Sequence, residues 1–234
     1  MTCRGSLCSG SLARGSVSWI KIALLGIVAL GVDLPRADAH PHILIDARTE
    51  LLFNAQGQVV GVNNVWDFDD AFSAYAIQGY DSKGDGKPTR EDLQPFAEIN
   101  LNSLKEYGYF TRMKIDGVNI GFAHPKNYFD VFANEKLTLT FTLPLAKPLD
   151  ISGKTLQLEV YDPTYFAAIT FAQHDPVKLV GAAAGCESVV HRPEPLDPAI
   201  ASQVAAIPAS QRAPPPNLFA VTDKLVNATR VSCK

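Results

Sequence analysis

Two histidines separated by a proline, His40-Pro41-His42, are the residues of this chain whose types and spacing best suit chemistry. They follow Ala37-Asp38-Ala39, which has the small-x-small pattern that signal peptidase recognises. Cleavage after Ala39 would place a free amine and two imidazoles within three residues. Such nitrogen ligands suit nickel, zinc, cobalt or copper better than magnesium. The pattern predicts a transition-metal site in which the amine and ring of His40 chelate the ion and His42 assists.

Pro41 shapes this prediction because it lacks a backbone N–H. A square-planar site built on deprotonated backbone amides is therefore excluded, and a brace through the amine and imidazole of His40 is favoured. Further ligands have to come from other parts of the chain. The candidates are Asp162 and His124, with His174, His191 and Asp67 as alternatives. The alternative interpretation is a solvated chain terminus that binds no metal.

A second candidate cation site is the twelve-residue stretch from Asp81 to Asp92, which matches the calcium loop of an EF-hand in outline. Two positions depart from the pattern: Lys83 stands where an oxygen ligand is expected, and Asp92 is one methylene shorter than the usual bidentate Glu. The alternative is a polar turn before a capped helix. The remaining positions of the predicted calcium loop are Asp81, Asp85, Gly86, the Lys87 carbonyl and Thr89.

Sequence motifs of known catalytic sites are absent from this chain, since no GxSxG, HExxH or Cys–His pattern occurs. The nearest approach to a catalytic set is the carboxylate cluster of Asp67, Asp69 and Asp70 after Trp66. Such clusters more often cap a helix, because helix N-termini favour negative charge. We therefore expect a protein that is not an enzyme, and a hydrolase using this cluster is the alternative.

The first 39 residues read as a signal peptide. Basic residues precede an uncharged apolar run from Ile22 to Val32, which is too short to span a bilayer. We predict export to the periplasm and no membrane span after processing, the alternative being an uncleaved anchor. Of the 4 cysteines, Cys186 and Cys233 lie outside this segment, and an oxidising compartment favours a disulfide between them. The net charge of −3, without a basic block, argues against nucleic acid as a partner.

Hydrophobic periodicity indicates which elements position these residues. Apolar residues alternate with polar ones at 43–53, 137–143 and 156–160, and Asp116-Gly117 is a hairpin signal. Between these strands, about 69–107 reads as a helical insertion, with Thr89 and Asp92 as a capping box. We predict an α+β fold, mostly antiparallel β and sandwich-like, over 40–192. The inserted helix–loop–helix resembles a degenerate EF-hand. The segment 193–234 is predicted to be a Pro-rich C-terminal wrap, with one short helix near Ile200, that is tied back by the disulfide.

A set of motifs spread over roughly 40–192 matches those of a known family. They are His40-Pro41-His42 with Ile45-Asp46, Trp66-Asp67-Phe68-Asp69 with Phe72-Ser73, the loop 81–86, Asn102-Ser103-Leu104 with Tyr107-Gly108-Tyr109-Phe110, Phe141-Thr142-Leu143-Pro144-Leu145, Tyr161-Asp162-Pro163-Thr164-Tyr165-Phe166 and Gly185-Cys186. With these motifs the chain resembles a bacterial family of unknown function, number one thousand and seven, which is described as the periplasmic component of an uncharacterised ABC-type transport system. The resemblance implies an exported protein without an established activity, encoded near nickel, cobalt and zinc uptake systems. It favours a metal-binding accessory protein that works with a membrane metal transporter, whereas the alternative is a calcium-stabilised interaction module.

Overall fold

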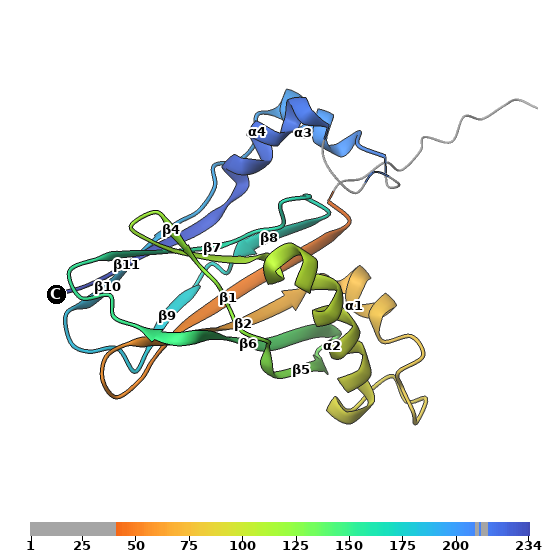
Figure 1. Ribbon diagram of the computed structural model, residues 1–234. Coiled ribbons are helices and arrows are strands. Elements are labelled where there is room, and N and C mark those ends of the chain that lie inside the picture. The colour runs from red at the N-terminus through yellow and green to blue at the C-terminus, as the bar shows by residue number, and fades with distance from the viewer. Residues whose placement is uncertain (1–40, 209–210, 212–214) are drawn as a thin grey trace, which may run out of the picture. The chain divides into compact units, whose positions relative to one another are not determined.

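The computed structural model describes residues 41–208, 211 and 215–234 (Figure 1). The predicted signal peptide, 1–39, and His40 lie outside the described residues. All the elements below belong to one compact unit, Ala37–Lys234.

Strands make up most of the regular structure, and most pairs of neighbouring strands are antiparallel, which confirms the predicted α+β class. The strands are β1 (Ile43–Phe53), β2 (Val59–Phe68), β3 (Thr111–Ile115), β4 (Val118–Ile120), β5 (Lys126–Ala133), β6 (Lys136–Leu149), β7 (Thr155–Val160), β8 (Ala167–Phe171), β9 (Val177–Val180), β10 (Cys186–His191) and β11 (Asn227–Cys233). The helices are α1 (Asp70–Ala76), α2 (Arg90–Leu104), α3 (Pro198–Ala205) and α4 (Pro216–Thr222), with 3-10 turns η1 (Lys105–Phe110) and η2 (Asp223–Leu225).

The strands form two sheets. The first has the order β5-β6-β2-β1-β8, with β9 also pairing with β1, and the second has the order β10-β11-β7-β3-β4. The pairs β1–β8 and β1–β9 are parallel. The Asp116-Gly117 dipeptide turns β3 into β4 as predicted, with Ile115 opposite Val118. A two-residue connection of this kind suits the twist of antiparallel strands.

The inner face of the first sheet is covered by two different elements along its length. Towards one end, α1 and α2 pack on it through Ala76, Leu93 and Ala97, and Figure 1 shows α2 beside β5. Towards the other end, Leu51 and Val62 pack against residues of the second sheet, including Leu156 and Val231. The fold therefore combines sheet-on-sheet packing with helix-on-sheet packing over one hydrophobic face.

Two buried asparagines connect the sheets by hydrogen bonds. Asn227 of β11 accepts from the Phe171 amide at 3.0 Å and donates to the carbonyls of Ile169 at 2.5 Å and Val160 at 3.3 Å. Asn64 of β2 accepts from Thr49 at 3.0 Å and donates to Thr111 of β3 at 3.1 Å. Both side chains are fully buried, and their partners offset the cost of taking amide groups out of water.

The C-terminal segment contains more regular structure than the sequence pattern indicated, although the short helix expected near Ile200 is present as α3. Its last strand, β11, lies between β10 and β7 in the second sheet, and the helices α3 and α4 precede it. The inward positions of β11 include the polar residues Asn227 and Thr229, so the alternation of apolar residues that marks a strand is weak there. Cys186 stands opposite Cys233 in the β10–β11 register, and the predicted disulfide between them is confirmed.

None of the helices in the described part of the chain combines the length and the apolar character that crossing a membrane requires.

Candidate functional site

His42 lies just before β1, and hydrogen bonds to two other segments fix the chain there. Its backbone N–H donates to the Phe166 carbonyl at 2.8 Å, and its ring lies 4.9 Å from the ring of Phe166 between centroids. Two residues later, the Leu44 amide donates to the Asp69 carboxylate at 2.7 Å. His42 is therefore half-buried, with its imidazole against the ring of Phe166. The backbone at this point is held in place by hydrogen bonds.

Asp162, a candidate metal ligand, is buried and holds the turn that presents Phe166 to His42. Its Oδ1 accepts from the amide and the hydroxyl of Thr164, both at 2.7 Å, and its Oδ2 accepts from the Ala167 amide at 2.9 Å. Three of its acceptor positions are thus occupied. In this structure the carboxylate of Asp162 positions the start of β8 and, through it, His42.

His124, the other candidate ligand, is exposed in the segment between β4 and β5. It lines a surface pocket together with the cationic side chains of Lys105, Arg112 and Lys114, and this setting opposes a bound cation. Within residues 41–208, 211 and 215–234, no group of three or more His, Cys, Asp or Glu side chains is arranged to hold a metal ion. The structure therefore does not bring His42, Asp162 and His124 together into one site.

The predicted calcium loop connects α1 to α2 and is folded around Asp81. Asp81 Oδ2 accepts from the Gly86 amide at 2.6 Å, and Oδ1 accepts from the Gly84 amide at 3.0 Å. Gly86 has φ = 74°, a conformation that glycine adopts without strain and that the sixth position of a calcium loop requires. Asp85 bends the chain further by accepting from the Lys87 amide at 2.9 Å.

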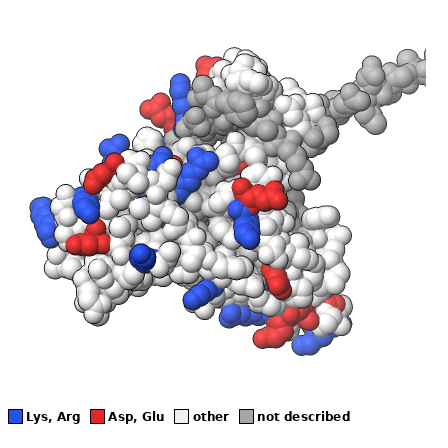
Figure 2. Space-filling model, in the orientation of Figure 1, with Lys and Arg blue, Asp and Glu red and all other residues white. Residues whose placement is uncertain are grey.

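The last residue of the predicted calcium loop, Asp92, completes a capping box on α2. Its Oδ2 accepts from the Thr89 amide at 2.8 Å and from the Thr89 hydroxyl at 2.7 Å, while the Asp92 amide donates back to that hydroxyl. These hydrogen bonds, led by that from the Thr89 backbone, lower the pKa of Asp92. Figure 2 shows acidic and basic side chains next to each other over this connection, at the lower right. The predicted capping box is therefore present, and the positive charges of the loop lie close to its carboxylates.

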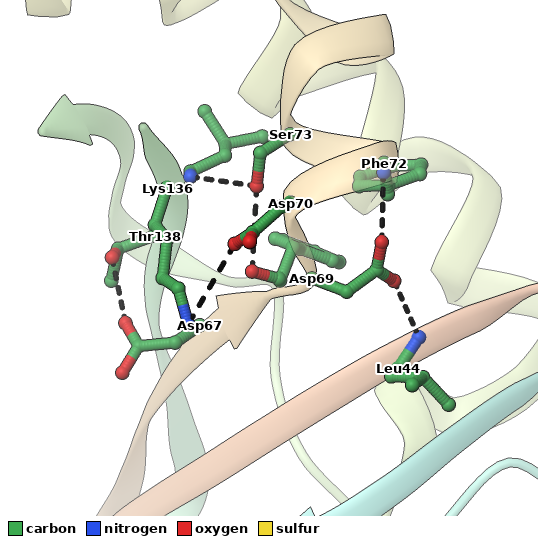
Figure 3. A network of polar contacts seen from close by, with 10 residues as sticks. Leu44, Asp67, Asp69, Asp70, Phe72, Ser73, Lys136 and Thr138 are labelled. Atoms are coloured by element: carbon green, nitrogen blue, oxygen red, sulfur yellow. Dashed lines mark hydrogen bonds and ion pairs between the residues drawn. The ribbon is translucent and has the colours of Figure 1, made fainter. Parts of the chain in front are cut away.

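The carboxylates that follow Trp66 have structural partners, as Figure 3 shows. Asp67 forms an ion pair with Arg48 at 2.8 Å and accepts from the Thr138 hydroxyl at 2.7 Å. Asp69 is the N-cap of α1, since its Oδ1 accepts from the Phe72 amide at 2.9 Å, and its other oxygen holds Leu44. The cluster thus ties α1 to the start of β1, in agreement with the capping interpretation.

Sequence reasoning missed the most unusual carboxylate in the described chain, Asp130 of β5. Its side chain is fully buried, and neither oxygen has a hydrogen-bond partner among the described residues. It stands opposite Leu139, which in turn stands opposite Trp66, so it shares the inner face of the first sheet, where α2 packs on β5. Burial raises the pKa of Asp130 to about 7. In the sequence, Asp130 stands two residues from Tyr128 and two from Phe132, so all three lie on one face of β5, a strand that was not predicted from the sequence.

A family described as protein of unknown function (DUF1007) matches residues 24–233. An uncharacterised protein of Haemophilus influenzae is 28% identical over 177 residues, which cover 74% of this chain and 82% of that protein. An uncharacterised 15.5 kDa protein from the trpE 3′ region of Spirochaeta aurantia is 29% identical over 120 residues, or 51% of this chain and 84% of that protein. Since the family match spans most of the sequence, this chain belongs to the DUF1007 family of proteins of unknown function.

Proposed function

We propose that this protein is an exported, periplasmic metal-binding accessory protein that passes a transition-metal ion to a membrane uptake system. The ion is of the nickel, cobalt, zinc or copper kind, because the proposed ligands are nitrogen donors. His40 supplies its free amine and its imidazole, and His42 supplies a second imidazole. Asp162 acts indirectly by holding the turn at Phe166. The transport partner rests on the resemblance of the gene setting to that of metal uptake systems.

The observation that carries this proposal is the fixed position of His42. Its amide is tied to Phe166 at 2.8 Å, and the chain just beyond it is tied to Asp69 at 2.7 Å. A ligand held beside the start of an ordered strand loses less conformational freedom on binding than one on a free terminus, so ordering it costs less binding energy. With the predicted cleavage after Ala39, the amine and ring of His40 lie two residues from this anchored point.

The test is metal titration of protein exported with its own signal sequence, after intact mass has established that it starts at His40. Nickel, copper and zinc are titrated into this protein, into a version with one added alanine before His40, and into His42→Ala. The added residue turns the chelating amine into an amide, so binding weakens, and it also weakens in His42→Ala. Affinity falls at acid pH, because the nitrogen ligands must be deprotonated.

The matched control is His174→Ala, which removes an exposed imidazole that is not among the ligands proposed here, His40 and His42. It leaves the affinity unchanged. Equal affinity in the native-start and alanine-extended proteins would show that the amine is not a ligand, and the proposed site would then be rejected. A mass that places the start after His42 would have the same consequence.

A second function, a calcium-stabilised interaction module, is favoured by the geometry at Asp81 and Gly86. A carboxylate oxygen can accept an amide hydrogen and still coordinate a cation, so the hydrogen bonds of Asp81 leave it usable. Lys83→Asp adds an oxygen ligand and removes a repelling charge, and it should therefore tighten calcium binding measured by calorimetry. Lys178→Asp, at an exposed position on β9, controls for the change of net charge. If calorimetry detects no heat of calcium binding with either the parent or Lys83→Asp, the loop is a turn that binds no calcium.

A further inference from the structure

A pocket of about 810 Å³ lies beside the outer edge of β3, and we call it the β3-edge pocket. β4 pairs with β3 at Met113–Ile115, so Thr111 and Arg112 have no strand partner on that side among the residues that the structure describes. The charged side chains that line the pocket are all basic, although the whole chain has a net charge of −3. The residues used below are Lys105, Tyr109, Arg112, Lys114, Phe122 and His124.

The guanidinium of Arg112 is held in place before any ligand arrives. Its Nη1 donates to the hydroxyl of Tyr161, and its central carbon lies 4.8 Å from the centroid of that ring. Contact with an aromatic face orients a guanidinium, and its planar fork leaves further N–H groups for a second acceptor. Arg112 is therefore a pre-organised donor at the rim of the pocket.

The other basic groups differ in how far they are neutralised. Lys114 forms an ion pair with Glu159, at 3.0 and 3.3 Å from its two oxygens. In the described part of the chain, the side chains of Lys105 and His124 have neither an ion pair nor a hydrogen bond. The positive charge that remains for a ligand thus comes from Arg112 and Lys105, with His124 nearby.

The wall of the pocket next to α2 is a strained turn. Gly108, Tyr109 and Phe110 follow one another in the left-handed region, with φ of 63°, 56° and 51°. For residues other than glycine this conformation is unfavourable, because Cβ comes too close to the following carbonyl oxygen. The turn is held by the Tyr161 amide, which donates to the Phe110 carbonyl at 2.9 Å. Backbone strain of this kind concentrates at ligand sites, where the surrounding structure maintains it.

We propose that the β3-edge pocket binds the phosphate group of an organic phosphate. Arg112 contacts two oxygens through its fork and Lys105 neutralises remaining charge, since guanidinium geometry matches a phosphate bidentately. The volume exceeds that of a phosphate ion alone, and Phe122 offers an apolar wall to the organic part. Two sources share this chemistry, a soluble phosphate ester and a phospholipid headgroup. The site does not depend on the proposed metal site at His40 and His42.

The experiment uses the protein that starts at His40, labelled with ¹⁵N, and titrates it with glycerol phosphate. Saturable shifts are expected for the amides of Gly108 and Asn119 and for the Nε–H of Arg112. Arg112→Gln weakens binding about tenfold or more, because a charge-assisted hydrogen bond contributes about 1.5–3 kcal/mol. Lys105→Gln also weakens it. Lys178→Gln, which removes one exposed charge on β9, leaves it unchanged.

A parallel arm measures co-sedimentation with vesicles of phosphatidylcholine that contain phosphatidylglycerol. Binding of vesicles that is lost in Arg112→Gln, without binding of glycerol phosphate, supports the site and identifies a lipid headgroup as its source. Binding of glycerol phosphate without vesicles identifies a soluble ester. No saturable response in either arm overturns the proposal, as does equal weakening by Lys178→Gln, which would mean general attraction to charge. Circular dichroism confirms that each variant is folded.

Discussion

The buried carboxyl of Asp130 makes the folding stability of this protein depend on pH in a predictable direction. Burial raises the pKa of Asp130 from 3.8 to about 7, and the side chain is fully enclosed under α2. Between these two values the folded protein holds a proton that the unfolded chain has lost. The free energy of unfolding therefore falls as pH rises through this window and reaches its lower level above pH about 7.

The size of the effect follows from the same two values. At about 1.4 kcal/mol per pKa unit, the difference between them corresponds to about 4 kcal/mol. Asp130→Asn keeps the shape of the side chain and cannot ionise. Its free energy of unfolding, relative to the parent, is therefore expected to rise by up to about 4 kcal/mol between pH 4 and pH 8. The buried amide adds a penalty that does not depend on pH.

Urea denaturation followed by circular dichroism at pH 4, 5, 6, 7 and 8 measures this difference. Asp46→Asn is the same change at an exposed position on the outer face of β1, and it controls for the loss of a surface charge. A ¹³C-detected titration of the Asp130 carboxyl gives its midpoint directly. A stability difference that stays constant across the pH range would refute the reasoning, because it would mean that the folded state stabilises the charged carboxylate as well as water does.

Three further predictions concern groups that hold the fold together. Asn227→Ala removes three buried hydrogen bonds, two of them between the sheets, and should lower the free energy of unfolding by about 3 kcal/mol or more, measured by urea denaturation, and a loss below about 1 kcal/mol would contradict this role. Thr89→Ala breaks the capping box and should cost about 1 kcal/mol in the same assay, with exposed Ser103→Ala as the control. Replacing Cys186 and Cys233 by serine opens a loop with a sequence separation of 47 and should cost about 4 kcal/mol on the chain-entropy model; thiol labelling of the denatured, unreduced parent should find no reactive thiol.

The strands and caps whose signals are local could be read from the sequence. The alternation at 43–53 and 137–143, the Asp116-Gly117 turn and the Thr89–Asp92 box all appear in the structure where the pattern indicated them. Each depends on residues within a few positions of one another, so the chain itself carries the information. The disulfide was also predictable, since Cys186 and Cys233 are the cysteines that follow the predicted signal peptide.

The tertiary structure alone decided where polar groups are buried and which of them meet. β11 lies inside the second sheet, where Asn227 and Thr229 form hydrogen bonds with strands that are distant in the sequence. Because its inward residues include polar ones, the pattern of apolar residues does not reveal this strand. Asp130 looks in the sequence like an ordinary surface carboxylate. Its burial follows from α2 packing on β5, and that contact joins segments about 30 residues apart. Pairing over such distances is set by the packing of the whole domain, and local periodicity does not contain it.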